Sequence, residues 1–561
     1  MLHHRFGSRE YAPARRPRSR SRAVLWALLA MSALSCNHTL YRAKFTPPAG
    51  AAAAPLDAEA AFLKCHMNDG SLYVLEAWSL DRPQGLVRGR GIHYAMSRVP
   101  LERGAFEVPL DGVVLFETNA PESVTDGSVA VLAVMTGASL VVTALCATNP
   151  KACFGSCPTF YAFDGERESL QAEGFSASVA RALESTDVDA MWTARPREAR
   201  FEVRMTNDAL ETHVVDSVRV LAAPRPAGGR VLRAGDVYYP AFALAPPATC
   251  AAQGRDCLAE VAATDGHEYK SEADPHDLAT RETLDLTFDA RALAGASVEG
   301  TPDVLAAGRF PRAADSNRAA VGVRYGLLVV ARNSLLNTFL FYQGLAYMGR
   351  SAGEIIARLD RGAGGVGRLL DVQGLLGGIR VQAADADGQW SDAGAFDEVG
   401  PLALEAQVIP LPPGAPAPTR IRLLATRGYW RIEQIALAAL GPPIVPRAFE
   451  PASVSRMGVP RPDAKERLAP GGDHLLSWPR DEWLLTFDLP AGDQELFLES
   501  RGYYYEWIRR DWLGDENPLE LARFMLDPRG EMQRLAPQYK ALEGRMEPVF
   551  WQSRLGAERV R

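Results

Sequence analysis

Alternating hydrophobic and polar residues recur along the chain and predict mostly β structure. In ARFEVRMTN, residues 199–207, Phe201, Val203 and Met205 share one face and charged residues occupy the other. This period of two is typical of a half-buried strand. DGSLYVLEAWSL, FEVPLDGVVLFET, RETLDLTFDA and EWLLTFDLP have the same character, some beside Asp-Gly turns. We therefore expect a mainly β, multi-domain protein of antiparallel sandwich or jelly-roll-like modules with a few helices.

Three segments depart from the strand pattern. LLNTFLFYQGLAYMG, near 335–349, is apolar on nearly all sides and predicts a buried helix. Asn517-Pro518 predicts a helix start, because Asn caps well and Pro suits the first turn. The 24 uncharged residues from Gly127 to Pro150 are long enough to cross a bilayer as a helix. A buried helix or two core strands is the alternative interpretation of that third segment.

The N-terminus has the pattern of an export signal. Seven Arg and one Glu lie within the first 22 residues, and the uncharged run AVLWALLAMSALSC follows and ends at Cys36. Ala33-Leu34-Ser35-Cys36 resembles the lipobox of bacterial lipoproteins. The resemblance implies lipidation of Cys36, and Asn37 after it implies the outer membrane. A plain signal peptide or an uncleaved anchor is the alternative.

Shifts in composition predict an order of segments along the chain. They are a signal peptide over 1–35, a lipid anchor with a Pro/Ala tether over 36–56, an N-terminal β domain over 57–126, an apolar helix or membrane segment over 127–150, a central β domain over 151–350, a jelly-roll-like module over 370–442, a C-terminal β and helical segment over 443–530, and a charged tail over 531–561.

The charge balance excludes one class of partner. Cleavage after residue 35 removes seven Arg and one Glu, which changes the formal net charge from −7 to −13. An acidic body argues against nucleic acid, whose phosphates attract clustered Lys and Arg. Membrane attachment is therefore expected through acyl chains on Cys36.

Cysteine usage predicts disulfides. Six cysteines remain besides Cys36, and an even number in an exported chain implies bridges. The six candidates are Cys65, Cys146, Cys153, Cys157, Cys250 and Cys257. Cys250 and Cys257 flank a Gly-bearing hairpin and form the first expected pair; Cys153 with Cys157 is the second, with Cys146 as a competitor. The Cys-x3-Cys spacing differs from the redox Cys-x2-Cys, and we expect no metal and no cofactor.

Five aromatic residues are candidate ligand readers. Trp390 and Trp430 lie in GGIRVQAADADGQW and RIRLLATRGYWRIEQIAL, a region that resembles galactose-binding-like jelly rolls of discoidin type. Tyr503, Tyr504 and Trp507 gather in ESRGYYYEWIRRDW. These side chains suit stacking on sugar rings or gripping a partner protein. Packing of the same segment on a sheet is the alternative.

Three phrases resemble a family of uncharacterised bacterial exported lipoproteins. They are HMNDGSLYVLEAWSLD with VPLDGVVLFETN, the motif NPKACFGSCPTFY with its continuation AFDGERESLQAEGFSAS, and FLESRGYYYEW. The hydrolase motifs Gly-x-Ser-x-Gly and His-Glu-x-x-His do not occur in the sequence, nor does the phosphate-binding loop. We expect a non-enzymatic envelope lipoprotein, periplasmic or surface-exposed, that binds or assembles with an envelope protein. A carbohydrate-binding or carbohydrate-processing surface protein, or a membrane-embedded part of a secretion or transport assembly, are the alternatives.

Overall fold

The computed structural model describes most of the chain after the N-terminal region. The described residues are 38–46, 48, 56, 60, 62–124, 157–196, 200–270, 281–289, 293, 324–360, 376–385, 387–397, 400–412, 419–469, 471–507 and 516–553. The protein is mainly β, with several antiparallel sheets, as the hydrophobic pattern predicts. Cys36, Cys146, Cys153 and the apolar segment 127–150 lie outside the described residues.

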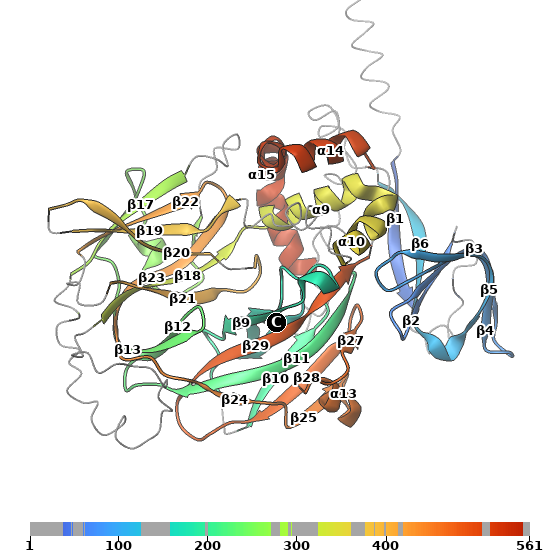
Figure 1. The fold of residues 1–561 in the computed structure, drawn as a ribbon, viewed down its shortest axis with the longest axis horizontal. Helices are drawn as coiled ribbons and strands as arrows, with labels where there is room; N and C mark the ends of the chain where they lie inside the picture. Colours follow the sequence, from blue (N-terminus) through green and yellow to red (C-terminus); the bar gives the residue numbers. More distant parts are fainter. Residues whose placement is uncertain are drawn as a thin grey trace, which may run out of the picture.

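The N-terminal sheet has six strands in the order β1-β6-β2-β3-β4-β5, all antiparallel. Its strands are β1 (His38–Thr46), β2 (Leu63–Met67), β3 (Leu72–Asp81), β4 (Leu86–Tyr94), β5 (Pro100–Pro109) and β6 (Val113–Val124), with the turn η1 (Leu110–Gly112). Figure 1 shows this sheet, in blue, projecting from one end of the body with β4 and β5 outermost. The tether expected over 36–56 is wrong in part, because β1 pairs along its whole length with residues 116–124 of β6.

A first sandwich combines two distant parts of the chain. Its outer sheet has the order β26-β25-β28-β10-β7-β8, and its inner sheet the order β24-β11-β29-β9 with β27 beside β11. The strands are β7 (Thr159–Phe163), β8 (Glu168–Glu173), β9 (Ser185–Ala190), β10 (Arg200–Thr206), β11 (Glu211–Pro224), β24 (Arg447–Phe449), β25 (Ser453–Arg456), β26 (Val459–Pro460), β27 (Leu475–Ser477), β28 (Glu482–Asp488) and β29 (Gln494–Glu506), with η2 (Arg181–Leu183) and α13 (Pro462–Arg467). Phe201, Val203 and Met205 of β10 are buried in it, as predicted.

A second sandwich is inserted between the two halves of the first. Its sheets have the orders β13-β12-β21-β18-β23-β16 and β15-β14-β17-β22-β19-β20. The elements are β12 (Arg230–Ala234), β13 (Val237–Ala245), β14 (Thr249–Ala252), β15 (Arg255–Asp256), α6 (Leu258–Val261), β16 (Tyr269–Lys270), β17 (Arg281–Thr287), β18 (Arg324–Asn333), β19 (Ile379–Ala384), β20 (Trp390–Phe396), β21 (Glu405–Pro410), β22 (Arg420–Thr426) and β23 (Trp430–Leu440).

The insertion corrects the expected domain boundaries. The strands of the proposed module 370–442 pair with β17 and β18, so the later part of the expected central domain and this module form one sandwich. Likewise β28 and β29, from the expected C-terminal segment, pair with β10 and β11. Local strand patterns carry no information about which distant strands pair, and the order of the segments alone suggested separate modules.

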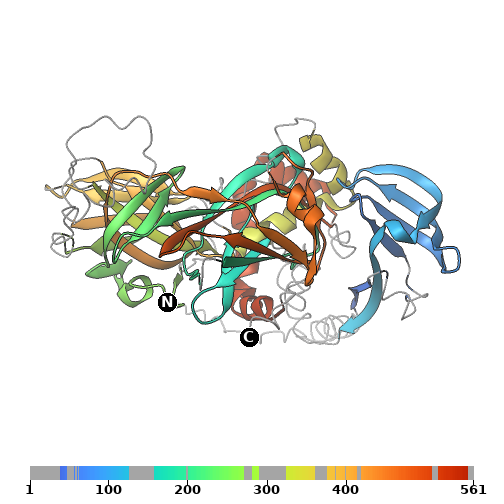
Figure 2. The same cartoon turned by 90° about the horizontal axis from the view of Figure 1, so that it is seen from below.

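The two sandwiches stack into four layers. Leu327 and Val329 of β18 pack toward the β17–β22 sheet, while Leu328 and Val330 pack toward β11 and β29 of the first sandwich. A strand covered on both faces reads as a continuous apolar run, which explains the sequence LLVV in β18. Figure 2 shows the resulting elongated body with the N-terminal sheet at one end.

Helices fill the space beside these layers. They are α9 (Leu336–Met348), η4 (Gly349–Ser351), α10 (Ala352–Asp360), α14 (Pro518–Leu526) and α15 (Pro528–Ser553). The buried helix and the helix start at Pro518 are confirmed, and the Asn517 side chain accepts hydrogen bonds from two backbone N–H groups at 3.2 Å. The charged tail expected over 531–561 is wrong in its first part, because α15 buries Met532, Leu535 and Tyr539 against α9.

Candidate functional site

An open hollow of about 450 Å³ crosses β3, β4 and β5 of the N-terminal sheet. The hollow is lined by the small residues Ala77, Ser79 and Ala105, whose side chains do not fill the space above the strands. Gly89 also lines it, and a Cβ there would lie 2.7 Å from the Ala77 carbonyl oxygen, so this position requires glycine. The hollow is concave and accessible, as a binding surface must be.

Charged side chains surround the hollow. Arg88 donates to Glu107 at 2.8 Å and also pairs with Asp81. Both carboxylates raise the pKa of the exposed Arg88 guanidinium, which therefore stays charged. Arg90, directly opposite Ala105, is exposed and pairs with no acidic group among the residues described. The hollow thus offers one engaged and one available guanidinium, with the aromatic residues Trp78 and Phe106 also in its lining.

Four of the five aromatic candidates are buried, which corrects their expected role as ligand readers. Trp430 packs edge-on against Phe396 inside the second sandwich. Tyr503 and Tyr504 alternate along β29, whose sheet is covered on both faces, and Trp507 donates to the Thr212 hydroxyl at 2.9 Å. The aromatic content of the segment could not reveal that both of its faces are covered.

Trp390 is the exception. It is half-buried at the start of β20, an edge strand of the second sandwich. The guanidinium carbons of Arg420 and Arg422 lie 5.1 and 4.4 Å from its ring centroid. An indole flanked by two arginines on an accessible edge is compatible with ligand stacking.

The cysteines divide into one bridge and two thiols within the described residues. Cys250 and Cys257 form a disulfide with a Cα–Cα distance of 5.0 Å, as their spacing predicts. Cys65 and Cys157 are buried free thiols, which corrects their expected place in bridges. Burial raises the pKa of Cys65 to about 12 and that of Cys157 well above its usual value. Both thiols stay protonated and behave as small core residues, not as nucleophiles.

A cluster of side chains around a buried glutamate connects the N-terminal sheet to the body. Glu117 of β6 accepts from Lys64 at 2.6 Å and shares a 3.0 Å hydrogen bond with the imidazole Nε2 of His66. The His66 ring stacks on Trp507 at the end of β29, with centroids 3.5 Å apart. The guanidinium carbon of Arg98 lies 5.8 Å from the centroid of the same Trp507 ring. We call these five residues the N-terminal joint.

Burial governs the titration of this joint. Desolvation lowers the pKa of His66 to about 4, although the hydrogen bond and the charge of Glu117 act to raise it. Desolvation also lowers the pKa of Arg98 to about 10. Desolvation opposes ionisation of Glu117 as well, but Lys64 and His66 outweigh it and bring the pKa of Glu117 to about 2. At neutral pH the joint therefore contains a carboxylate at Glu117 beside a neutral imidazole at His66.

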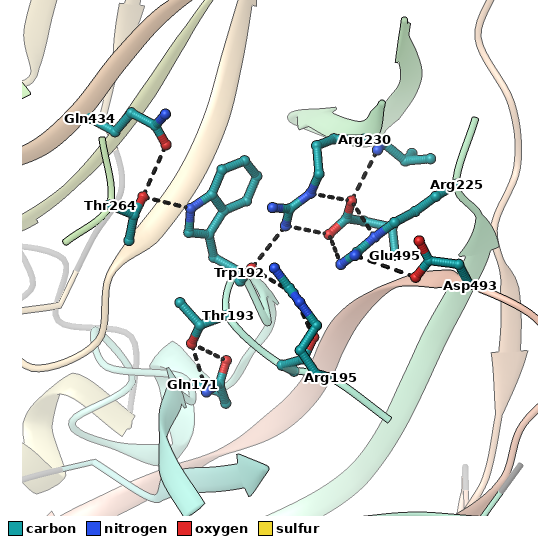
Figure 3. A network of polar contacts seen from close by, with 12 residues as sticks. Gln171, Trp192, Thr193, Arg195, Arg225, Arg230, Thr264, Gln434, Asp493 and Glu495 are labelled. Atoms are coloured by element: carbon teal, nitrogen blue, oxygen red, sulfur yellow. Dashed lines mark hydrogen bonds and ion pairs between the residues drawn. The ribbon is translucent and has the colours of Figure 1, made fainter. Parts of the chain in front are cut away.

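A second buried glutamate joins the two sandwiches. Figure 3 shows Glu495 of β29 between Arg225 and Arg230, which lie where the chain passes from β11 to β12. Both arginines contact both carboxylate oxygens, at 3.1 Å from Arg225 and 2.7 Å from Arg230, and the Val231 N–H donates as well. Arg230 also stacks on Trp192, 3.6 Å from its centroid. We call these five residues the sandwich joint.

The sandwich joint extends into the second sandwich. The indole Nε1 of Trp192 donates to Thr264 at 2.9 Å, and Thr264 donates to Gln434 of β23 at 2.9 Å (Figure 3). Sequence reasoning missed both joints, since their partners are 51–53 residues apart in one and 264–270 in the other. A lone glutamate in a strand gives no local signal of such a role.

One cluster has the composition of a metal site. Ligand atoms of Glu184, Asp216 and His474 lie within 4.8 Å of one another, and a β-bulge in β11 turns Asp216 out of the ladder. However, the Nε of Arg501 lies 3.5 Å from Glu184 and 3.4 Å from Asp216. The arginine already supplies the positive charge that these carboxylates attract, so the cluster is an internal ion-pair network.

The comparisons with known proteins add no assignment. No family model matches the sequence, and a search of the curated proteins finds no match. Across the described part of the chain, every helix is too short or too polar to span a bilayer. The geometry of the described residues therefore carries the functional argument.

Proposed function

We propose that this protein is an exported, envelope-anchored lipoprotein that acts as a non-enzymatic binding or assembly component. The observation that carries this proposal is the hollow on the projecting N-terminal sheet. It combines an accessible concave surface with an available guanidinium at Arg90. The buried carboxylates of Glu117 and Glu495, by contrast, are paired with basic side chains within the fold.

Export and anchoring rest on the sequence and on one bridge. The Cys250–Cys257 disulfide supports maturation in an oxidising compartment. The lipobox-like Ala33–Cys36 supports acylation of Cys36 and attachment to the outer membrane. We expect Cys36→Ser to release the protein from the membrane fraction into the soluble one. Mass spectrometry of the wild-type N-terminus checks this directly, and an unmodified Cys36 in the native protein contradicts it.

Filling the hollow tests the binding role. We expect the purified chain to co-sediment with isolated peptidoglycan sacculi or with outer-membrane vesicles, and Ser79→Trp to reduce the retained fraction at least about tenfold. Ser453→Trp, at an exposed strand position in the first sandwich, is the matched control. Equal retention of all three proteins contradicts the hollow as the binding site. Release of soluble fragments from sacculi at enzyme-like rates contradicts a non-enzymatic role.

Carbohydrate recognition is the second candidate, and Trp390 supports it. Its half-exposed indole between Arg420 and Arg422 is a suitable stacking surface for a sugar ring. We expect Trp390→Ala to abolish any signal on a glycan array. Phe449→Ala, which removes another half-exposed ring beside Arg447, is the control. An array on which the wild-type protein gives no signal contradicts this candidate.

A further inference from the structure

The strand β5 is an open edge of the N-terminal sheet. It is the last strand in the order of the N-terminal sheet and extends over ten residues, Pro100–Pro109. Most of it is exposed, including Leu101 at 58% of its surface. Figure 1 places it at the outer end of the molecule, away from the sandwiches. A long open edge is a template for another strand unless something blocks it.

The backbone groups that face outward can be identified. The Leu110 N–H donates to the Gly85 carbonyl at 2.9 Å, in register with the β4–β5 ladder. Hydrogen-bonded and non-hydrogen-bonded pairs alternate in antiparallel strands. Arg103, Ala105, Glu107 and Pro109 consequently direct their backbone groups away from β4. A proline at 109 agrees with this assignment, because it has no N–H and is tolerated at an open edge.

The side chains at the outward-facing positions of β5 are complementary to those of a second, antiparallel copy of β5. Arg103 and Glu107 are exposed, lie on the same face and flank Ala105 symmetrically. An antiparallel copy of β5 centred on Ala105 would place each Arg103 opposite the Glu107 of the other copy. Glu107 and Asp81 both pair with Arg88, so these three side chains together carry a net negative charge. This charge attracts the Arg103 guanidinium of the other copy. Opposite charges in directly facing positions stabilise a strand pair.

The other face of β5 fits the same register. Centring on Ala105 places each Gly104 opposite the Phe106 of the other copy, and an aromatic ring compensates for a glycine at a sheet edge. Phe106 is half-buried and therefore partly available for this contact.

Neighbouring registers are less favourable. Centring the pair on Arg103 would oppose two arginines, and centring it on Glu107 would oppose two glutamates. Like charges in facing positions destabilise a strand pair. Centring on Gly104 or Phe106 would leave Arg103 opposite Ala105 or Pro109, without a charge partner. The charge pattern of β5 therefore selects a single two-fold register.

We propose that β5 pairs antiparallel with β5 of a second copy of this chain about a two-fold axis at Ala105. The two six-stranded N-terminal sheets then form one continuous sheet. This dimer goes beyond the proposed binding role and does not depend on it. The contact is small, as transient interfaces are, and attachment of both copies to one membrane would favour it.

Charge reversal tests the register. Sedimentation of the mature chain, with Cys36→Ser to remove acylation, is measured up to about 100 μM. We expect a reversible dimer, and Arg103→Glu or Glu107→Arg alone to raise its Kd at least about tenfold, because each creates two like-charge pairs. A mixture of the two variants restores both attractive pairs, so we expect a heterodimer of wild-type affinity. Both substitutions are at exposed positions, and circular dichroism confirms that the variants fold. A monomeric wild-type chain, or a mixture that stays monomeric, overturns the proposal.

Cross-linking tests the position of the axis. Hydrogen-bonded residues in facing strands have Cα atoms about 5.5 Å apart, within disulfide range. We therefore expect Ala105→Cys to form a covalent dimer under mild oxidation at least about tenfold faster than Ala77→Cys. Ala77 is exposed and in register with Ala105 two strands away, which makes it the matched control. Equal rates for the two variants would overturn the two-fold register even if a dimer forms.

Discussion

The N-terminal joint and the sandwich joint each contain one buried glutamate, but the two glutamates have different hydrogen-bond partners. Glu495 accepts from two bidentate arginines and a backbone N–H. Glu117 binds one lysine and one imidazole. In the N-terminal joint, His66 Nδ1 and Arg98 Nη2 are buried without a hydrogen-bond partner in the described structure.

This difference predicts two levels of stability within one chain. Buried polar groups that are fully paired rigidify a junction, whereas each unpaired one costs about 1–3 kcal/mol of desolvation. The two sandwiches also share a core between β11, β29 and the β18 sheet, and the chain passes between them twice. We infer that the four stacked sheets unfold as one unit and that the N-terminal sheet separates from them at a lower free energy.

Removing the charge of Glu495 is expected to have the largest effect. Glu495→Gln leaves Arg225 and Arg230 with no buried carboxylate between them, which should lower the free energy of unfolding of the body by about 3–5 kcal/mol. Guanidinium unfolding followed by circular dichroism measures the loss. Asp493→Asn is the control, because this carboxylate is 71% exposed and contacts Arg225 at 3.4 Å. A loss no greater than that of the control would show that Glu495 does not hold the sandwiches together.

Glu117→Gln is expected to have a smaller and more local effect. It leaves Lys64 in a buried position without its carboxylate, at a cost of about 2–3 kcal/mol. Hydrogen exchange should accelerate in β2 and β6, while β11 and β29 keep their protection. Acceleration of equal size in β11 would contradict the separation of the two units.

Acid is expected to weaken the N-terminal joint specifically. The pKa of His66 is about 4 in the folded protein, below the ordinary value of 6.5, so the unfolded state binds the proton more readily. The stabilisation is complete above pH 6.5 and declines as the pH falls toward 4, by about 2 kcal/mol at pH 5. Lys64, Arg98 and Glu117 face this imidazole, and Glu117 stays ionised throughout because its pKa is about 2.

The measurement is denaturant unfolding of the N-terminal sheet at pH 7 and pH 5. His66→Gln should remove most of the difference between the two pH values. A wild-type transition that is as stable at pH 5 as at pH 7 contradicts the buried neutral state of His66.

Replacing arginine by lysine in one joint, and lysine by arginine in the other, is expected to have the smallest effects on stability. Arg230→Lys loses the bidentate fork on Glu495 and the stack on Trp192, which should cost about 1–2 kcal/mol. Lys64→Arg keeps the charge at a position that makes a single contact with Glu117, and it should change stability by less than about 1 kcal/mol. Thermal unfolding of both variants checks the order, and a larger loss for Lys64→Arg would reverse the comparison.

The parts of the fold that local patterns determine were predictable. Alternation located β10, uniform apolarity located α9, and the Asn517-Pro518 pair located the start of α14. The Cys250–Cys257 bridge followed from a short hairpin. In each case, the relevant residues are within about ten positions of one another, where propensity and spacing act directly.

The parts that depend on distant segments were not predictable. Burial of Tyr503 and Tyr504 requires covers on both faces of β29, which come from residues far away in the sequence. The hollow depends on Ala77, Ser79 and Ala105 meeting across three strands, and small residues give no signal of this kind. Glu117 and Glu495 resemble solvent-facing residues in the sequence, since only tertiary pairing makes their burial favourable.

Native-state hydrogen exchange in increasing guanidinium shows whether the N-terminal sheet opens independently of the two sandwiches. It measures the opening free energy of each strand in the unmodified protein. Amides of β2, β3 and β6 should share an opening free energy at least about 2 kcal/mol below that of β11, β18, β23 and β29, which should open together. A single opening free energy common to the N-terminal sheet and both sandwiches would show that the whole protein unfolds as one unit.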